Sequence, residues 1–324
     1  MRFAILLRIS SRRARIAIVL ASSLASLGAL EAGLRDHDDE IVFLEAGRRY
    51  GIRGGSHGTN SLGFHERELA MVPDEGTRRI VVLGDSMTWG TTTPDAAWPR
   101  IAETTLGTPW QLVNLSMYGY DAEQSLATLE SVGWRYHPER VVFASYMNDL
   151  VPTELITVGD PALSAWISPR GFLPWSIRQN FATARIVEGS IRRFSYAESD
   201  TSDTFRDALI GLRAATLAHG VPLLVVGLGP HAMALGKACD EAAGEVGRCA
   251  WAQSRLDRQA TIAAEVGVRF APMLSALDAP PPEGWFPANR NDWEHPSEAG
   301  HRRIGYAVGS VLQGWVSQGL PAPP

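Results

Sequence analysis

A serine placed directly after an apolar segment is the first candidate for chemistry in this chain. Ser86 stands in VVLGDSMTWG, where the apolar run RRIVVLG ends and a turn begins. A hydroxyl at the carboxyl end of a buried strand lies at the edge of an α/β sheet where ligands bind. It also lies close to helix N-terminal amides, which stabilise an oxyanion. Glycine, aspartate and serine are also common turn and N-cap residues, so GDS without partners indicates only a helix cap.

A histidine and an aspartate near the end of the chain supply what a serine nucleophile requires. Asp292 stands three residues before His295 in NDWEHPSEAGH, just ahead of the last predicted helix. A base must take the hydroxyl proton, and a carboxylate on the other ring nitrogen fixes the tautomer of that base. A turn aspartate and a surface histidine are each reasonable alternatives by themselves. Together with GDS, these residues predict a triad of Ser86, His295 and Asp292, whereas His301 is predicted to pack or to face solvent.

Short apolar segments that alternate with amphipathic ones must position these residues. The expected strands are RRIVVLG (78–84), WQLVNLS (110–116), ERVVFASY (139–146), VPLLVVGLG (221–229) and VGVRFAP (266–272). The expected helices are near 97–106, 121–134, 204–219 and 251–265, with a last one from about 296 to 318. Continuously apolar strands are typical of a parallel sheet that is buried on both faces. The alternation predicts an α/β fold, a three-layer α/β/α sandwich with a five-stranded parallel sheet.

Four short motifs in a fixed order make the sequence resemble the SGNH (GDSL-type) hydrolase family over residues 79–314. The motifs are GDSM, NLSMYGYDAEQ, YMNDL and DWEHPSEAGH, and each falls at the end of a predicted strand or before the last helix. The resemblance implies the flavodoxin-like fold of that family. It also implies that Ser86 is the nucleophile and that Asp292 and His295 complete the triad.

The resemblance further implies an oxyanion hole with three donors. They are the backbone N–H groups of Ser86 and Gly119 and the side-chain amide of Asn148. The alternative for Asn148 is a turn cap after a strand. The third motif departs from the usual G-x-N-D because Tyr146 replaces the glycine, which would narrow the site or add a hydroxyl. Asp85, beside the nucleophile, is expected to bind local backbone amides rather than to act as a base.

A segment upstream of the first motif, GTNSLGF, resembles one found before the catalytic domain in membrane-anchored bacterial members of the family. That segment usually reads N-S-x-G-F-R, and here His65 stands in place of the arginine. The resemblance therefore assigns no role to His65.

The first 34 residues are predicted to be an export signal or a membrane anchor. Residues 1–15 carry five arginines and no acid, and IAIVLASSLASLGAL (16–30) follows them. This is the pattern of an export signal. A spanning helix needs about 20 apolar residues, so an anchor would use residues 16–34, whereas cleavage after Ala25 would release the body. In both cases the body is expected to be exported, periplasmic or extracellular. A buried or surface amphipathic helix is the alternative.

The rest of the chain divides into a polar extension (35–78) and a hydrolase domain (79–318). An insertion at 151–203 contains several aromatic residues, which indicate a lid or a binding wall, with simple packing as the alternative. Cys239 and Cys249 are expected to form a disulfide if the body is exported, and otherwise to be free thiols.

Composition limits the partners. A net charge of −5 argues against a nucleic-acid partner. No spacing of cysteine or histidine predicts a metal site, and no cofactor is expected. The expected substrate is a small-molecule or glycan ester, with removal of O-acetyl groups from a carbohydrate favoured because the chain is expected to be exported. Acyl transfer to a polysaccharide, hydrolysis of a lipid, lysophospholipid or thioester, and a non-catalytic binding module are the alternatives.

Overall fold

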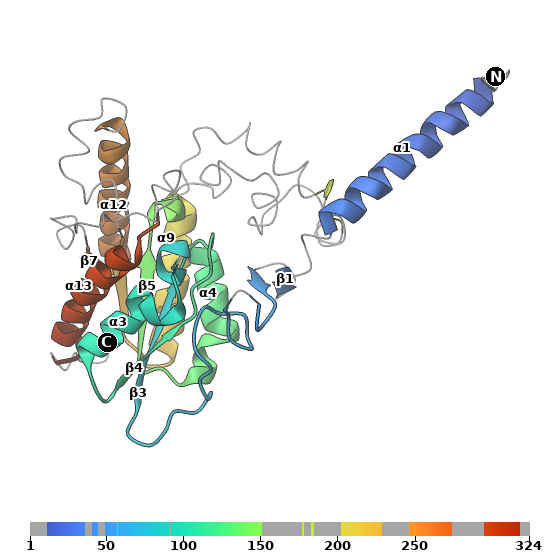
Figure 1. The fold of residues 1–324 in the computed structure, drawn as a ribbon. Helices are drawn as coiled ribbons and strands as arrows, with labels where there is room; N and C mark the ends of the chain where they lie inside the picture. Colours follow the sequence, from blue (N-terminus) through green and yellow to red (C-terminus); the bar gives the residue numbers. More distant parts are fainter. Residues whose placement is uncertain are drawn as a thin grey trace.

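The computed structural model describes most of the α/β body and the N-terminal helix (Figure 1). The described residues are 12–35, 41–44, 49–150 except His57 and Thr91, 177, 183–184, 202–228, 246–273 and 295–317. Asp292, Cys239 and nearly all of the insertion at 151–203 lie outside these ranges, as do the side chains of Asn148 and Cys249.

A five-stranded parallel sheet forms the centre of the body, which confirms the predicted fold class. Its strands are β3 (Arg78–Gly84), β4 (Trp110–Asn114), β5 (Arg140–Ser145), β6 (Leu223–Gly227) and β7 (Arg269–Pro272). They lie in the order β4-β3-β5-β6-β7. The order reverses between β3 and β5, and ligands in open α/β sheets bind beyond the carboxyl ends of the strands at such a point.

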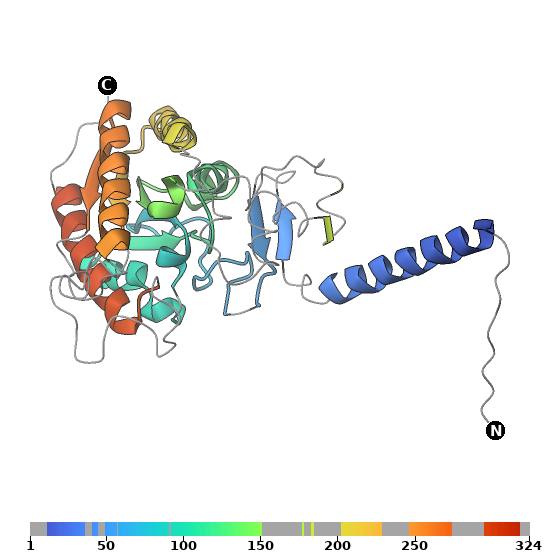
Figure 2. The same ribbon diagram turned by 90° about the horizontal axis from the view of Figure 1, so that it is seen from above.

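Helices cover both faces of the sheet and complete the three layers (Figures 1 and 2). One face packs against α3 (Trp98–Leu106) and α13 (Glu298–Ser317). The other packs against α4 (Ala122–Ser131), α9 (Ser202–Ala218) and α12 (Val246–Val266). Successive side chains of a strand point to opposite faces. Ile80 and Val82 accordingly belong to the core on the α3 side, and Val81 and Leu83 to the core on the α4 side.

Helices α3 and α13 approach each other closely along a seam that contains two glycines. A Cβ atom added to Gly305 would lie 2.5 Å from the Cβ atom of Ile101, and one added to Gly309 would lie 2.6 Å from that of Thr105. Any larger residue at either position would therefore have to push α13 away from α3.

The polar extension contains a β-hairpin that its sequence pattern did not predict. Strands β1 (Ile41–Leu44) and β2 (Arg49–Ile52) pair antiparallel. Ile52, the last residue of β2, and Phe64, which follows the hairpin, are buried in the core on the α4 side. The extension is thus packed onto the α/β body, although its composition resembles that of a linker.

Helix α1 (Arg12–Arg35) projects away from the body in both views (Figures 1 and 2). Its segment Ile16–Gly33 is long and apolar enough to cross a membrane, and none of that segment is buried. A signal sequence near the N-terminus satisfies the same criteria. Near the end of the helix, a side-chain oxygen of Glu31 accepts a hydrogen bond from the backbone N–H of Thr183, in the insertion, at 3.0 Å. The alternative of a helix buried in the body does not fit this arrangement.

Candidate active site

The first motif places Ser86 at the start of a one-turn helix that follows β3 without a break. Helix α2 spans Ser86–Trp89, and Asp85 is its N-cap. The Asp85 carboxylate is 3% exposed and accepts a hydrogen bond from the backbone N–H of Met87 at 2.9 Å. This confirms that Asp85 binds a local backbone amide. Ser86 itself is half-buried, at the carboxyl end of β3.

The second motif is bonded to the first through Asn114, the last residue of β4. Its side-chain N–H₂ group donates to the backbone carbonyls of Thr88 and His65, each at 3.4 Å. Its side-chain oxygen accepts from the backbone N–H of Ser116 at 3.1 Å. Five residues after Asn114, Gly119 has a φ of +72°, a left-handed conformation that glycine adopts without strain. The loop that carries the Gly119 amide is therefore fixed against α2.

The third motif forms the short helix η4 (Met147–Leu150) after β5, and its backbone includes Asn148. Two buried polar side chains hold this turn. The backbone N–H of Tyr146 donates to Asp149 at 2.9 Å, and its carbonyl accepts from the side-chain amide of Gln259, in α12, at 2.5 Å. The Tyr146 side chain is 2% exposed and belongs to the core on the α3 side, so it does not form an exposed wall of the site.

Asp149 links the third motif to the start of α4. Burial raises the pKa of Asp149 well above its ordinary value, and the charges of Asp85 and Asp121 act in the same direction. Hydrogen bonds from the backbone N–H groups of Tyr146 and Ala122 act in the opposite direction. Because Ala122 belongs to the second motif, one carboxyl group joins the two segments that would carry Gly119 and Asn148.

Replacement of Asp149 by asparagine is expected to change how stability depends on pH. A carboxyl group whose pKa is raised by folding binds protons more tightly in the folded state. Its contribution to stability is therefore lost as pH rises from the unfolded value of about 3.9 through the folded value. Asparagine does not titrate, so the stability of Asp149→Asn relative to the natural chain should improve from pH 4.5 to pH 8. Guanidinium denaturation at several pH values measures this difference. Asp203→Asn, at a side chain that is 96% exposed, is the control. A stability difference between Asp149→Asn and the natural chain that does not change with pH would contradict the expectation.

The fourth motif places His295 in a bend shortly before α13, where it is half-buried. The first turns of α13 lie against the segment after α2. The fully buried His301 shows this, since its Nδ1 accepts from the backbone N–H of Trp98 at 3.3 Å. A Cβ atom on Gly90 would also lie 3.0 Å from the His301 ring. His301 is thus a packed residue, as predicted.

The structure brings three of the five predicted site positions to one edge of the sheet. Ser86, Gly119 and Asn148 follow the neighbouring strands β3, β4 and β5. His295 precedes the helix that packs beside the segment following Ser86. The position of Asp292 lies outside the described residues.

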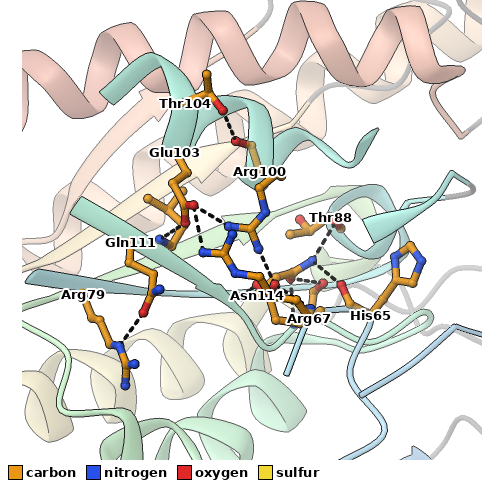
Figure 3. Close-up of polar contacts among 12 residues, drawn as sticks. His65, Arg67, Arg79, Thr88, Arg100, Glu103, Thr104, Gln111 and Asn114 are labelled. Carbon is orange, nitrogen blue, oxygen red and sulfur yellow. Dashed lines mark hydrogen bonds and ion pairs between the residues drawn. The ribbon is translucent and has the colours of Figure 1, made fainter. Parts of the chain in front are cut away.

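A polar cluster from the extension, not foreseen from the sequence, supports this edge (Figure 3). Glu66 is 4% exposed and accepts from the backbone N–H of Asn114 at 2.9 Å. It also forms an ion pair with Arg100 of α3. Glu103 binds both Arg100, at 2.6 Å, and Arg67, at 2.9 Å. Burial raises the pKa of Glu66, and the charge of Arg100 opposes this change.

Within the part of the chain that the structure describes, no group of three His, Cys, Asp or Glu side chains is placed to hold a metal ion.

No protein-family model and no curated protein matches the chain. Solved structures with similar folds include a lipolytic protein of the G-D-S-L family from Desulfitobacterium hafniense, with 12% identity, 73% of this chain and 100% of that chain covered, and a TM-score of 0.45. The esterase EstA from Pseudoalteromonas is 12% identical. The match covers 74% of this chain and 99% of EstA, with a TM-score of 0.45. The acetyl xylan esterase AlAXEase is 11% identical. The match covers 72% of this chain and 99% of AlAXEase, with a TM-score of 0.46.

Proposed function

We propose that the chain is a serine ester hydrolase with Ser86 as its nucleophile. The observation that carries this proposal is the position of the first three motifs, which follow three adjacent strands where the sheet order reverses. A nucleophile and the donors of an oxyanion hole must surround one carbonyl group. Adjacent strand ends of a parallel sheet offer that arrangement.

In the proposed reaction, the Ser86 hydroxyl attacks the ester carbonyl carbon while His295 takes the hydroxyl proton. The backbone N–H groups of Ser86 and Gly119 and the side-chain amide of Asn148 stabilise the oxyanion. His295 then gives the proton to the leaving alcohol, and an acyl-enzyme forms. Water, deprotonated by His295, then attacks the acyl carbon. The bond to the Ser86 oxygen breaks as His295 returns the proton to that oxygen, and the acid is released. Asp292 orients His295 and stabilises its charged form.

The favoured substrate is an O-acetylated carbohydrate outside the cytoplasm. The apolar helix α1, preceded by a basic segment, supports export of the body, with the arginines left on the cytoplasmic side. An uncleaved α1 would hold the body at a membrane. Fractionation of cells that express the full chain distinguishes the two cases, because an anchored body stays with the membrane fraction and a released body does not.

A substrate panel with active-site labelling tests the function. The folded chain is expected to release acetate from aryl acetates and acetylated xylan faster than it hydrolyses butyryl or long-chain esters. A serine-directed organophosphonate is expected to label Ser86, as peptide mass spectrometry would show. Faster hydrolysis of long-chain esters would favour a lipid substrate, and acyl capture by a sugar in preference to water would indicate a transferase. Failure to label Ser86 in the folded protein would contradict the proposal.

Replacement of Asn148 by alanine is expected to lower kcat by about 10²–10³-fold, because one donor to the oxyanion is lost. KM should change little, since the hydrogen bond strengthens mainly in the transition state. Steady-state kinetics on an aryl acetate measures both constants. The exposed Thr261, whose hydroxyl bonds to the carbonyl of Asp257 within α12, provides the control Thr261→Ala, which should leave kcat unchanged. Equal kcat values for Asn148→Ala and the natural chain would remove Asn148 from the site.

A further inference from the structure

We propose that His65 is a positioning residue that fixes the nucleophile helix α2 and the Gly119 loop relative to each other. This inference rests on the proposed function, because it assigns His65 a role in the same reaction. His65 belongs to the extension, lies outside the four motifs and is 5% exposed.

The first contact is with the C-terminal end of α2. The Nδ1 atom of His65 lies 2.7 Å from the backbone carbonyl oxygen of Trp89, to which a protonated Nδ1 donates. The His65 ring also stacks on the Trp89 ring, with centroids 5.0 Å apart and planes at 16°. Because α2 contains only Ser86–Trp89, the residue that His65 holds is one turn from the nucleophile.

The second contact is with the second motif. The backbone carbonyl of His65 accepts a hydrogen bond from the side chain of Asn114, which also donates to the carbonyl of Thr88 in α2 (Figure 3). The Trp89 ring in turn meets the Tyr118 ring edge to face, with centroids 5.6 Å apart and planes at 85°. Tyr118 immediately precedes Gly119.

These contacts matter because a single helical turn is unstable without external support. The last carbonyl groups of a helix also have no partner within the helix. His65 supplies one such partner and a flat surface against which Trp89 is fixed. Two of the three proposed oxyanion donors, the amides of Ser86 and Gly119, therefore lie on segments that His65 connects. A displacement of about 1 Å at a reacting group can cost about 10²-fold in rate.

Three variants separate the two kinds of contact. His65→Ala removes both the hydrogen bond and the ring, His65→Phe keeps a ring without the donor, and His65→Asn keeps a side-chain donor in place of Nδ1. We expect His65→Ala to lower kcat by about 10- to 100-fold with KM nearly unchanged, in line with the cost of misplaced groups. His65→Asn and His65→Phe should each recover part of kcat.

His219 provides a matched control at the other end of the sheet, before β6. It stacks on Trp134, with centroids 3.8 Å apart, and its Nδ1 lies 2.9 Å from the carbonyl oxygen of Ala215. His219→Ala removes the same kinds of contact away from the site and should leave kcat unchanged. An unchanged kcat in folded His65→Ala, or an equal loss in His219→Ala, would overturn the proposal.

Hydrogen exchange tests the positioning role independently of turnover. Backbone amides at 86–90 and 115–120 are expected to exchange about tenfold faster in His65→Ala than in the natural chain, since local opening becomes easier. They should not change in His219→Ala. If the natural chain hydrolysed no ester, the proposed function would fail while this exchange difference persisted. If exchange at both segments were unaltered, the positioning role would fail whatever the activity.

Discussion

Replacing Ser86 with alanine is expected to lower kcat/KM for ester hydrolysis by about 10⁴-fold or more, because the acyl-enzyme can no longer form. The loss should be almost entirely in kcat. The residual rate would come from substrate binding and the remaining oxyanion donors. Steady-state kinetics on an aryl acetate, with loss of organophosphonate labelling, measures the effect.

Folding of the Ser86→Ala variant should be nearly unaffected. Ser86 is half-buried at the first position of α2, and the cap of that helix is the Asp85 side chain rather than the serine. The exposed Ser310, whose hydroxyl bonds only to a carbonyl of its own helix in the described contacts, gives the control Ser310→Ala with unchanged activity. An Ser86→Ala variant that folds and retains the natural activity would exclude Ser86 as the nucleophile.

Replacing Glu66 with alanine is expected to lower the free energy of unfolding by about 3–5 kcal/mol, the cost of breaking a buried ion pair. The change removes the carboxylate that accepts from the backbone N–H of Asn114 and leaves Arg100 facing only Glu103 in the cluster of Figure 3. Since domains are stable by about 5–15 kcal/mol, this loss is a large fraction of the total. Guanidinium denaturation followed by circular dichroism measures it.

An exposed ion pair of the same residue types provides the comparison. Glu139 pairs with Arg78 at 2.6 Å, and the two side chains are 45% and 43% exposed. Glu139→Ala is expected to cost at most about 1 kcal/mol. The double variant Glu66→Leu with Arg100→Leu should be more stable than Glu66→Ala, because it also removes the buried Arg100 guanidinium, which loses one of its two carboxylate partners in Glu66→Ala. Equal losses for Glu66→Ala and Glu139→Ala would show that the cluster does not hold the extension to the body.

The parallel sheet and the motif positions could be predicted because their signals are local. Each strand is a short, continuous apolar run, and the first three motifs follow directly where such a run ends. The helix boundaries were close for the same reason; α9 begins at Ser202, two residues before the predicted position 204, while α12 begins earlier, at Val246.

The supports of the site could not be predicted because their partners are distant in sequence. Gln259 is one polar residue in an amphipathic helix, and no local pattern shows that it bonds to the turn after β5. Glu66 and His65 stand in an irregular polar segment, where a charged or polar side chain is usually solvated. They are buried only because β4, α2 and α3 meet around them. The predicted triad member Asp292 and the disulfide of Cys239 and Cys249 stay predictions.

The glycine seam between α3 and α13 also helps to set the position of the proposed base. His295 lies just before the first residue of α13, so the distance between His295 and Ser86 depends on the position of α13 along its own axis. A helix rises by about 1.5 Å per residue, which is more than the roughly 1 Å that catalytic geometry tolerates. Gly305 and Gly309 face Ile101 and Thr105 at distances that leave no room for a side chain, so a larger residue at either position would displace α13 relative to α3. A bulky residue in the seam would thus displace the proposed base from several helical turns away, although it would contact none of the proposed catalytic groups.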